Sequence, residues 1–369
     1  YKELKPGKIA YYDGVVEVNL SEIRPMIAMP FHPSHVYTIK ELNEGGRDLL
    51  EEIEKQAVDM LDNKELSLGL ADKYYDGKMH CDQGLIAGCS GGLYENLVAA
   101  AHILKGKSIG NERFAFSVYP SSHPIYMELM RNGALADLMD AGAVVRSAFC
   151  GPCFGAGDTP NNKGFSVRHT TRNFPNREGS KPGQGQMAAV ALMDARSIAA
   201  TAANNGRLTS AEEFADAFGN VPAYHFDDSA YKARVYNGFG NPEPEKKLFY
   251  GPNIKDWPEM PALGENILLK VCSKILDPVT TTDELIPSGE TSSYRSDPYA
   301  LSEFALSRKV PEYVGRAKAV RTLEKARQEG ENCEELNNMY DSVKNALGLQ
   351  ESADQMKKNT SVGSVVYAN

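Results

Sequence analysis

The stretch GLIAGCSGGLYENLVAAAHIL, residues 84–104, decides the fold class of this chain. Its first part is short and apolar, as in a buried strand, whereas residues 92–104 have the composition and length of a helix. Cys89 stands in the Gly-rich turn between the two. A strand that turns directly into a helix is typical of a parallel α/β sheet, in which such turns gather at one edge and form a site.

The same alternation continues along the chain. Residues 114–120 and 143–149 have strand composition and flank a helical stretch at residues 123–143, and residues 165–174 suggest a fourth strand. The Ala-rich residues 185–206 predict a further helix. We therefore expect an α/β fold of three layers, in which a mostly parallel sheet has helices on both faces.

Composition divides the chain into four segments. Residues 1–35 are interpreted as an extended arm from a preceding domain, in which VVEVNL (15–20) has strand composition. Residues 36–218 form the expected α/β domain, and residues 219–264 form a linker rich in Pro, Gly, Asn and aromatic residues. Residues 265–369 are interpreted as an incomplete second domain. Both ends look cut, so we expect a fragment of a longer protein.

The overall composition excludes several classes of protein. With 42% hydrophobic residues among 369, the chain can bury a core, and its net charge of −9 argues against nucleic acid as the main partner. It contains no apolar run of roughly 18 residues, the length that predicts a membrane span. Six cysteines in a chain of this length do not form a disulfide framework, which favours a reducing cytoplasm.

A second cysteine motif, SAFCGPCFGAGD at residues 147–158, follows another apolar run. Zinc sites, redox pairs and iron–sulfur clusters all use a CxxC pair such as Cys150 and Cys153. The chain has no second CxxC or His-x-x-x-His that would complete a zinc site, and Pro152 favours a loop over a thioredoxin-type helix. Buried structural cysteines remain the alternative.

Three thiolates, from Cys89, Cys150 and Cys153, can hold a cubane iron–sulfur cluster and leave its fourth iron open. An iron with an open coordination position can bind a substrate hydroxyl and act as a Lewis acid. Catalytic zinc sites likewise keep one coordination position open for water or substrate. This interpretation points to a dehydration reaction rather than to electron transfer.

Arginines stand out in the next segment, VRHTTRNFPNREG at residues 167–179. Guanidinium groups bind carboxylates through two parallel hydrogen bonds, and a di- or tricarboxylic acid needs several of them. Arg172 and Arg177, five residues apart beside a cysteine loop, therefore indicate an acidic ligand. The alternative is that one of them pairs with Asp158 or Glu178.

Together these motifs resemble those of the aconitase family of iron–sulfur hydro-lyases. The family's first cluster cysteine lies in a strand–Cys–Thr–Asn–Ser–helix turn, where this chain has GCSGGLYEN with Cys89. Its other two cluster cysteines lie in an Ala-Cys-Gly-Pro-Cys loop, matched here by AFCGPCFGAGD with Cys150 and Cys153. Its Arg-Asn-Phe-x-x-Arg motif appears here as RNFPNR, with Arg172 and Arg177.

The resemblance implies a [4Fe–4S] cluster bound by the three cysteines and substrate binding by Arg172 and Arg177. In the family's last domain, which swivels, a Thr-Thr-Asp is followed twelve residues later by an arginine that binds a substrate carboxylate. Asp283 and Arg295 keep that spacing, so the resemblance adds Arg295 as a substrate-binding residue and Asp283 as a supporting one. The chain then corresponds to the family's cluster-bearing third domain and the start of its swivel domain.

The chain also departs from the family's pattern. Ser90-Gly91 replaces Thr-Asn, Thr171 replaces the Asn before Arg172, and Glu284 replaces a His. These differences argue against citrate as the substrate and indicate a divergent hydratase. The family's earlier domains and the serine that acts as its base lie outside these residues. No catalytic base is therefore predicted here, and the remaining domains of the same enzyme are expected partners.

We expect a hydratase or dehydratase that acts on a small hydroxy di- or tricarboxylic acid by Lewis-acid chemistry, with no membrane partner. Two other functions stay open. One is a non-catalytic or regulatory domain of the aconitase type, and the other is a zinc-bearing structural domain. Metal content separates them, because only the first hypothesis predicts iron together with sulfide in an active enzyme.

Overall fold

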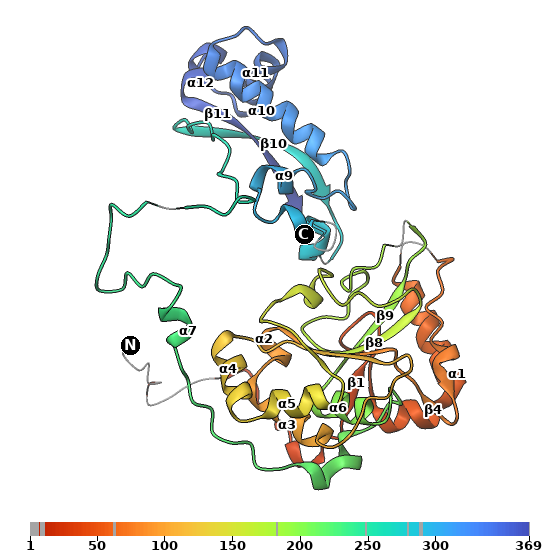
Figure 1. The fold of residues 1–369 in the computed structure, drawn as a ribbon. Helices are drawn as coiled ribbons and strands as arrows, with labels where there is room; N and C mark the ends of the chain where they lie inside the picture. Colours follow the sequence, from red (N-terminus) through yellow and green to blue (C-terminus); the bar gives the residue numbers. More distant parts are fainter. Residues whose placement is uncertain are drawn as a thin grey trace. The chain divides into compact units, whose positions relative to one another are not determined.

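The computed structural model separates the chain into two compact units, which are described one at a time (Figure 1). The first comprises residues 1–149, 163–174 and 189–226, and the second comprises residues 150–162, 175–188 and 227–369. The structure describes residues 7, 12–61, 64–181, 184–247, 249–278, 280–287 and 291–368, without the side chains of Asp283 and Ser292. The domain boundaries predicted from the sequence stay a prediction.

A seven-stranded sheet forms the framework of the first unit, in the order β2-β1-β9-β8-β5-β6-β7. Its strands are β1 (Met26–Ala28), β2 (Val36–Thr38), β5 (Gln83–Ile86), β6 (Ala115–Val118), β7 (Val144–Val145), β8 (Gly164–His169) and β9 (Ala188–Met193). β5 pairs in parallel with β6 and β8, and β6 pairs in parallel with β7. β1 is antiparallel to both β2 and β9. A separate hairpin joins β3 (Tyr74–Tyr75) to β4 (Lys78–Met79).

Helices flank this sheet. They are α1 (Ile39–Asp59), α2 (Gly88–Gly91), α3 (Tyr94–Leu104), α4 (His123–Arg131), α5 (Ala134–Asp140) and α6 (Ala195–Ala203), with 3₁₀ turns η1 (Leu20–Glu22), η2 (Ala71–Lys73) and η5 (Ala211–Ala217). α3 packs against α5 and α6, and α6 lies against β5 and β8 (Figure 1). The predicted α/β fold with a mostly parallel sheet is confirmed.

The predicted strands of the sheet are confirmed, each shorter than its apolar run, as β5, β6, β7 and β8. The prediction of one helix over residues 185–206 is wrong, because its first half is β9 and only the second half is helical. β9 lies inside the sheet between β1 and β8, where burial overrides the helix propensity of its alanines. α6 begins only after Asp194, whose carboxylate accepts a hydrogen bond from the Ser197 amide.

The helical stretch expected over residues 123–143 is confirmed and consists of two helices, α4 and α5, because Gly133 adopts a left-handed φ of 86° between them. One further prediction is wrong. Residues 15–20 form no strand. Val15 and Val16 are 87% and 89% exposed, and strand composition produces a strand only where neighbouring backbone and buried side chains support it.

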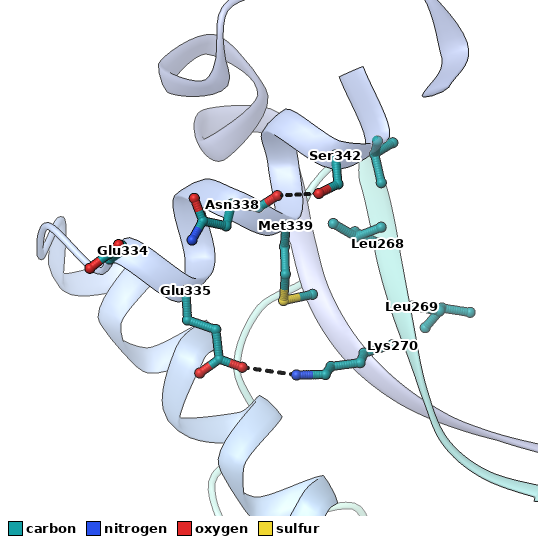
Figure 2. A pocket seen from close by; sticks show the side chains of 9 residues that line it. Leu268, Leu269, Lys270, Glu334, Glu335, Asn338, Met339 and Ser342 are labelled. Carbon is teal, nitrogen blue, oxygen red and sulfur yellow. Dashed lines mark hydrogen bonds and ion pairs between the residues drawn. The ribbon is translucent and has the colours of Figure 1, made fainter. Parts of the chain in front are cut away.

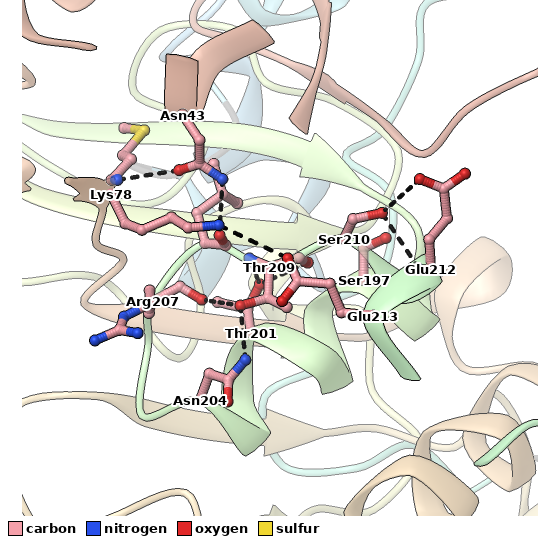
Figure 3. A network of polar contacts seen from close by, with 12 residues as sticks. Asn43, Lys78, Ser197, Thr201, Asn204, Arg207, Thr209, Ser210, Glu212 and Glu213 are labelled. Carbon is pink, nitrogen blue, oxygen red and sulfur yellow. Dashed lines mark hydrogen bonds and ion pairs between the residues drawn. The ribbon is translucent and has the colours of Figure 1, made fainter. Parts of the chain in front are cut away.

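A polar network joins α1 to the segment that follows α6 (Figure 3). Asn43 donates to the carbonyl of Leu208 at 3.0 Å and accepts from the Met79 amide at 3.2 Å. The Thr201 hydroxyl accepts from the Thr209 amide at 3.1 Å. These bonds satisfy buried backbone groups of an irregular segment, so the network holds this side of the unit together.

The second unit contains a two-stranded parallel sheet, β10 (Asn266–Ile275) and β11 (Thr360–Ala368). The helical segments of this unit are η3 (Gly151–Cys153), α7 (Ser229–Lys232), α8 (Thr282–Leu285), η6 (Ser292–Tyr294), α9 (Pro298–Ser302), α10 (Tyr313–Glu329), α11 (Glu334–Leu347) and α12 (Ala353–Asn359). Its core is made of Cys272, Val320, Leu323, Leu336, Tyr340, Met356 and Val362. The core therefore lies between the sheet and the helices α10, α11 and α12.

A shallow pocket lies between β10 and α11 (Figure 2). Leu268 and Met339 give it an apolar floor, and an ion pair of 2.9 Å joins Lys270 to Glu335. The contact ties the strand to the helix in the same unit. No helix among the described residues is both long enough and apolar enough to cross a membrane.

Candidate functional site

Cys89 lies just beyond the carboxyl end of β5, in the single helical turn α2, and its side chain is exposed. The turn is held against β8 by a hydrogen bond of 3.1 Å from the Ala87 amide to the His169 carbonyl. A Cβ on Gly91 would lie only 2.0 Å from that carbonyl oxygen. The close approach leaves no room for a side chain at this position of the chain.

Polar atoms without partners surround the turn. Asn96 fixes its backbone by donating to the carbonyls of Ser90 and Gly91, both at 3.1 Å. The Ser90 hydroxyl and Nδ1 of His169 are buried and have no hydrogen-bond partner among the described residues. Burial lowers the pKa of His169, although the nearby Asp194 acts in the opposite direction. The imidazole is therefore neutral near pH 7 and can still form a hydrogen bond.

Cys150 and Cys153 belong to one tight turn. Cys150 precedes η3, Cys153 ends it, and the Cys153 amide donates to the Cys150 carbonyl at 3.1 Å. Cys150 is exposed and Cys153 is buried, and neither is in a disulfide. The loop predicted around Pro152 is therefore a 3₁₀ turn rather than the start of a longer helix.

The arginine-rich segment separates into structural and exposed side chains. Arg168 is 1% exposed and donates to Ser166 and Gln83 inside the sheet. Asn173 is fully buried and donates to the carbonyl of Met29 at 2.7 Å. Arg172 between them is exposed. The buried neighbours anchor the loop on which Arg172 is presented, whereas Arg177 is half-buried and belongs to the second unit.

Arg295 follows η6 in the second unit and is exposed. The centre of its guanidinium lies 4.5 Å from the centroid of the Phe154 ring, and Phe154 directly follows Cys153. The structure therefore brings a predicted substrate-binding arginine next to the turn that carries two predicted cluster ligands. The prediction for Asp283 concerns a side chain outside the described residues.

Glu284, which replaces a His of the family pattern, has a structural role here. It completes a capping box with Thr281 at the start of α8, and Lys309 donates to it at 2.9 Å. Burial raises its pKa, but hydrogen bonds from the Thr281 backbone and from Lys309 outweigh burial and leave the pKa below the ordinary value. The carboxylate therefore stays charged and holds the start of α8 to Lys309.

Several predicted site residues lie in different units. Cys89 and Arg172 belong to the first unit, whereas Cys150, Cys153 and Arg295 belong to the second. Within the ranges that the structure describes, no three His, Cys, Asp or Glu side chains are grouped so that they could share a metal ion. A joint site of the three thiols stays a prediction.

The residues nevertheless fit an iron–sulfur cluster by their chemistry. Free thiols are the ligands that such clusters use, and Cys89 and Cys150 are exposed. The unpartnered Ser90 hydroxyl and His169 imidazole lie beside the Cys89 turn, where cluster sulfide or a substrate oxygen would satisfy them.

One residue of this region was missed by sequence reasoning. Phe154 directly follows the Ala-Cys-Gly-Pro-Cys motif and is not part of it, so nothing in the pattern singled it out. Its partner, Arg295, is 141 positions away in the chain, and only the folded structure brings the two together. An aromatic residue beside a cysteine motif, together with a predicted substrate-binding arginine elsewhere in the chain, is the signal that could have suggested a cation–π contact.

Comparison with known proteins identifies the family. The model of the aconitase family (aconitate hydratase) matches residues 1–200, more than half of the chain. The chain is also similar to proteins called "3-isopropylmalate dehydratase large subunit". These include one from Caldanaerobacter subterraneus, 28% identical over 214 residues, and ones from Caldicellulosiruptor saccharolyticus and Clostridium kluyveri, each 29% identical over 214 residues.

These alignments cover 58% of this chain and 41% of each relative, so the match spans less than half the length of the relatives. The family match includes Cys89, Cys150, Cys153, Arg172 and Arg177. The sheet, the cysteine turns and the matched residues agree with one another, and the chain belongs to the aconitase family.

Proposed function

We propose that this chain is the cysteine-bearing part of a hydro-lyase that removes water from a hydroxy di- or tricarboxylic acid and adds it back. One observation carries the proposal: the residue that follows the Cys150–Cys153 turn lies against the guanidinium of Arg295 in the second unit. A pair of cysteines and a guanidinium, a group suited to bind a carboxylate, thus lie in one local structure. The name of the relatives, a dehydratase, supports the same class of reaction.

Cys89, Cys150 and Cys153 are the proposed ligands of a [4Fe–4S] cluster. When bound through three thiolates, this group supplies an iron free of protein ligands, which is a Lewis acid for a substrate hydroxyl. Cysteine ligands must be reduced, and none of the six cysteines forms a disulfide in the structure. A reducing, cytoplasmic location therefore belongs to the proposal.

Arg172, Arg177 and Arg295 are the proposed substrate-binding residues. Their donors match carboxylate oxygens, and their charges stabilise the negative charge that develops when a proton leaves the carbon beside a carboxylate. On a chain with a net charge of −9, such local positive charge is needed to bind an anion. Asp283 is proposed to support the loop of Arg295.

The proton acceptor is proposed to come from other parts of the enzyme. The relatives are named as large subunits, so the remaining domains or a companion subunit are the expected partners. The relatives also make 3-isopropylmalate the first substrate to test. The replacements Gly91, Thr171 and Glu284 support this choice over citrate, because each departs from the pattern of aconitase proper.

Anaerobic reconstitution with iron and sulfide tests the cysteine assignment. We expect the visible absorption of a cubane cluster in the wild type, and its EPR signal after one-electron reduction with dithionite, and we expect loss of both in Cys89→Ser, Cys150→Ser and Cys153→Ser. Cys333→Ser is the matched control, since Cys333 packs against the core of the second unit and should leave the signal unchanged. Unchanged spectra in any of the three variants would contradict that ligand.

The reaction is tested on the complete enzyme with 3-isopropylmalate and with citrate. Formation of an unsaturated acid, followed by its ultraviolet absorption, supports the hydro-lyase. Zinc without sulfide in the purified protein would instead favour the structural alternative. A reconstituted cluster without turnover of either acid would favour a non-catalytic role.

A further inference from the structure

Phe154 and Arg295 form a contact to which the proposed reaction assigns no role. The guanidinium centre lies 4.5 Å from the ring centroid, within the range of a cation–π interaction. Phe154 is half-buried, and Arg295 is exposed. Both residues belong to the second unit, and the Cys153 turn fixes the backbone of the aromatic residue.

The contact orients Arg295 without using its hydrogen-bond donors. Among the residues and side chains that the structure describes, the Arg295 side chain has no hydrogen bond and no ion pair, and its guanidinium lies over the ring of Phe154. The π face of an aromatic ring attracts the positive charge of a guanidinium and needs none of its hydrogen-bond donors. A carboxylate instead accepts hydrogen bonds from the N–H groups in the plane of the guanidinium. Several of these N–H groups therefore remain available to a ligand.

Arg327 of the same unit shows the opposite arrangement. It donates twice to Glu324, at 2.8 Å each, and also to the carbonyl of Lys357 at 2.7 Å. Its donors are satisfied and its charge is balanced, as expected for a structural arginine. Arg295 is held in place but is not neutralised, which is what a carboxylate-binding residue needs.

We propose that Phe154 is a positioning residue for Arg295, and that its aromatic ring holds the guanidinium ready for a ligand carboxylate beside the Cys150–Cys153 turn. The assignment of that carboxylate to the substrate rests on the proposed function. A leucine would fill a similar volume but has no negative π face. The aromatic character of Phe154, rather than its size, is therefore the property that matters.

The test measures carboxylate binding apart from turnover. Succinate, a dicarboxylate without a hydroxyl group, is titrated into the chain, and the arginine side-chain signals are followed by NMR. Binding should weaken about two- to five-fold in Phe154→Leu, the loss expected for an exposed cation–π contact, and should persist in Phe154→Tyr. Arg295→Ala should weaken binding about tenfold or more.

Phe214→Leu is the matched control. Lys107 lies 5.4 Å from the Phe214 ring in the first unit, so this variant removes a cation–π contact of the same kind elsewhere. It should leave succinate binding unchanged. In the complete enzyme, Phe154→Leu should raise the KM for 3-isopropylmalate by the same factor and change kcat little, because the ring acts on the orientation of Arg295.

Equal succinate affinity in wild type and Phe154→Leu, with weaker binding in Arg295→Ala, would overturn the role of Phe154 and leave the proposed function intact. Absence of a ring-current shift on the Arg295 signals in the wild type, or an unchanged affinity in Arg295→Ala, would also overturn it. The complete enzyme could also turn over neither 3-isopropylmalate nor citrate while its succinate binding still depends on Phe154. That result would support the carboxylate site and reject the proposed reaction.

Discussion

At the scale of single residues, the loop of Arg172 depends on the amide of its neighbour. Asn173 is fully buried and donates to the carbonyls of Ala28 and Met29 at 3.3 and 2.7 Å. It thereby joins the loop after β8 to the end of β1. Arg168 has a similar structural role inside the sheet, so a motif rich in polar residues contains both anchors and exposed groups.

Gly91→Ala should destabilise the first unit by about 2–3 kcal/mol, the usual cost of forcing extra atoms into a packed region. The new Cβ would lie 2.0 Å from the His169 carbonyl oxygen, so the turn of Cys89 must move away from β8. Urea unfolding followed by circular dichroism measures the change. Gly14→Ala is the control, because nothing lies within 4 Å of a Cβ there, and its stability should match the wild type.

At the scale of elements, glycine has two different effects on α10. Gly315 lies in the helix, and Gly330 ends it with a left-handed φ of 71°. Gly315→Ala should stabilise the second unit by about 0.5–1 kcal/mol through helix propensity. Gly330→Ala should destabilise it by about 1 kcal/mol, because alanine disfavours the left-handed conformation.

The two variants Gly315→Ala and Gly330→Ala separate the effect of backbone conformation on stability from the effect of side-chain packing. A Cβ at either position meets nothing within 4 Å, so steric contact cannot explain a difference. Thermal unfolding of the two variants measures the sign of each effect. A destabilising Gly315→Ala would contradict the helix assignment at that position.

Glu324 joins α10 to β11 and should make the second unit sensitive to acid. Glu324 is 3% exposed, and its carboxylate accepts hydrogen bonds from Arg327 and from the Val362 amide. Burial raises the pKa of Glu324, but these hydrogen bonds outweigh burial and leave it below the ordinary value of 4.5. The contribution of Glu324 to the stability of the second unit is therefore complete above pH 4.5. It is lost as the pH falls through the lowered pKa of the folded state.

Glu324→Gln should lower stability at pH 7 by about 3 kcal/mol, since it leaves Arg327 without its buried partner. The stability of the variant should also depend less on pH below 4.5 than the stability of the wild type. Urea unfolding between pH 7 and pH 3 measures both effects, with Glu331→Gln, an exposed carboxylate, as the control. Parallel pH profiles for wild type and Glu324→Gln would show that this carboxylate is not the acid-sensitive group.

At the scale of the whole molecule, the segment before β10 is irregular and carries large exposed aromatic side chains. Phe239 and Phe249 are 96% and 91% exposed, and Trp257, the one tryptophan of the chain, is 74% exposed. Chymotrypsin cleaves after such residues where the backbone is accessible. The first cuts should therefore fall between residues 233 and 264, which also tests the predicted linker at 219–264.

Mass spectrometry of the first products locates these cuts. A variant with Ala at Phe239, Phe249 and Trp257 should be cleaved more slowly. Early cleavage inside residues 84–104 or within α10 would argue against the predicted linker, because those elements are packed in the interior of their units.

The sequence by itself determined the α/β class, the positions in the chain of the strands β5, β6, β7 and β8, and the motifs of the aconitase family. Strand and helix alternation and short motifs depend on neighbouring residues, so they can be recognised without the fold. The tertiary structure decided what depends on distant partners. Burial between β1 and β8 turned an alanine-rich segment into β9, and the exposed Val15 and Val16 remained outside the sheet. The contact of Phe154 with Arg295 likewise exists only because folding brings distant residues together.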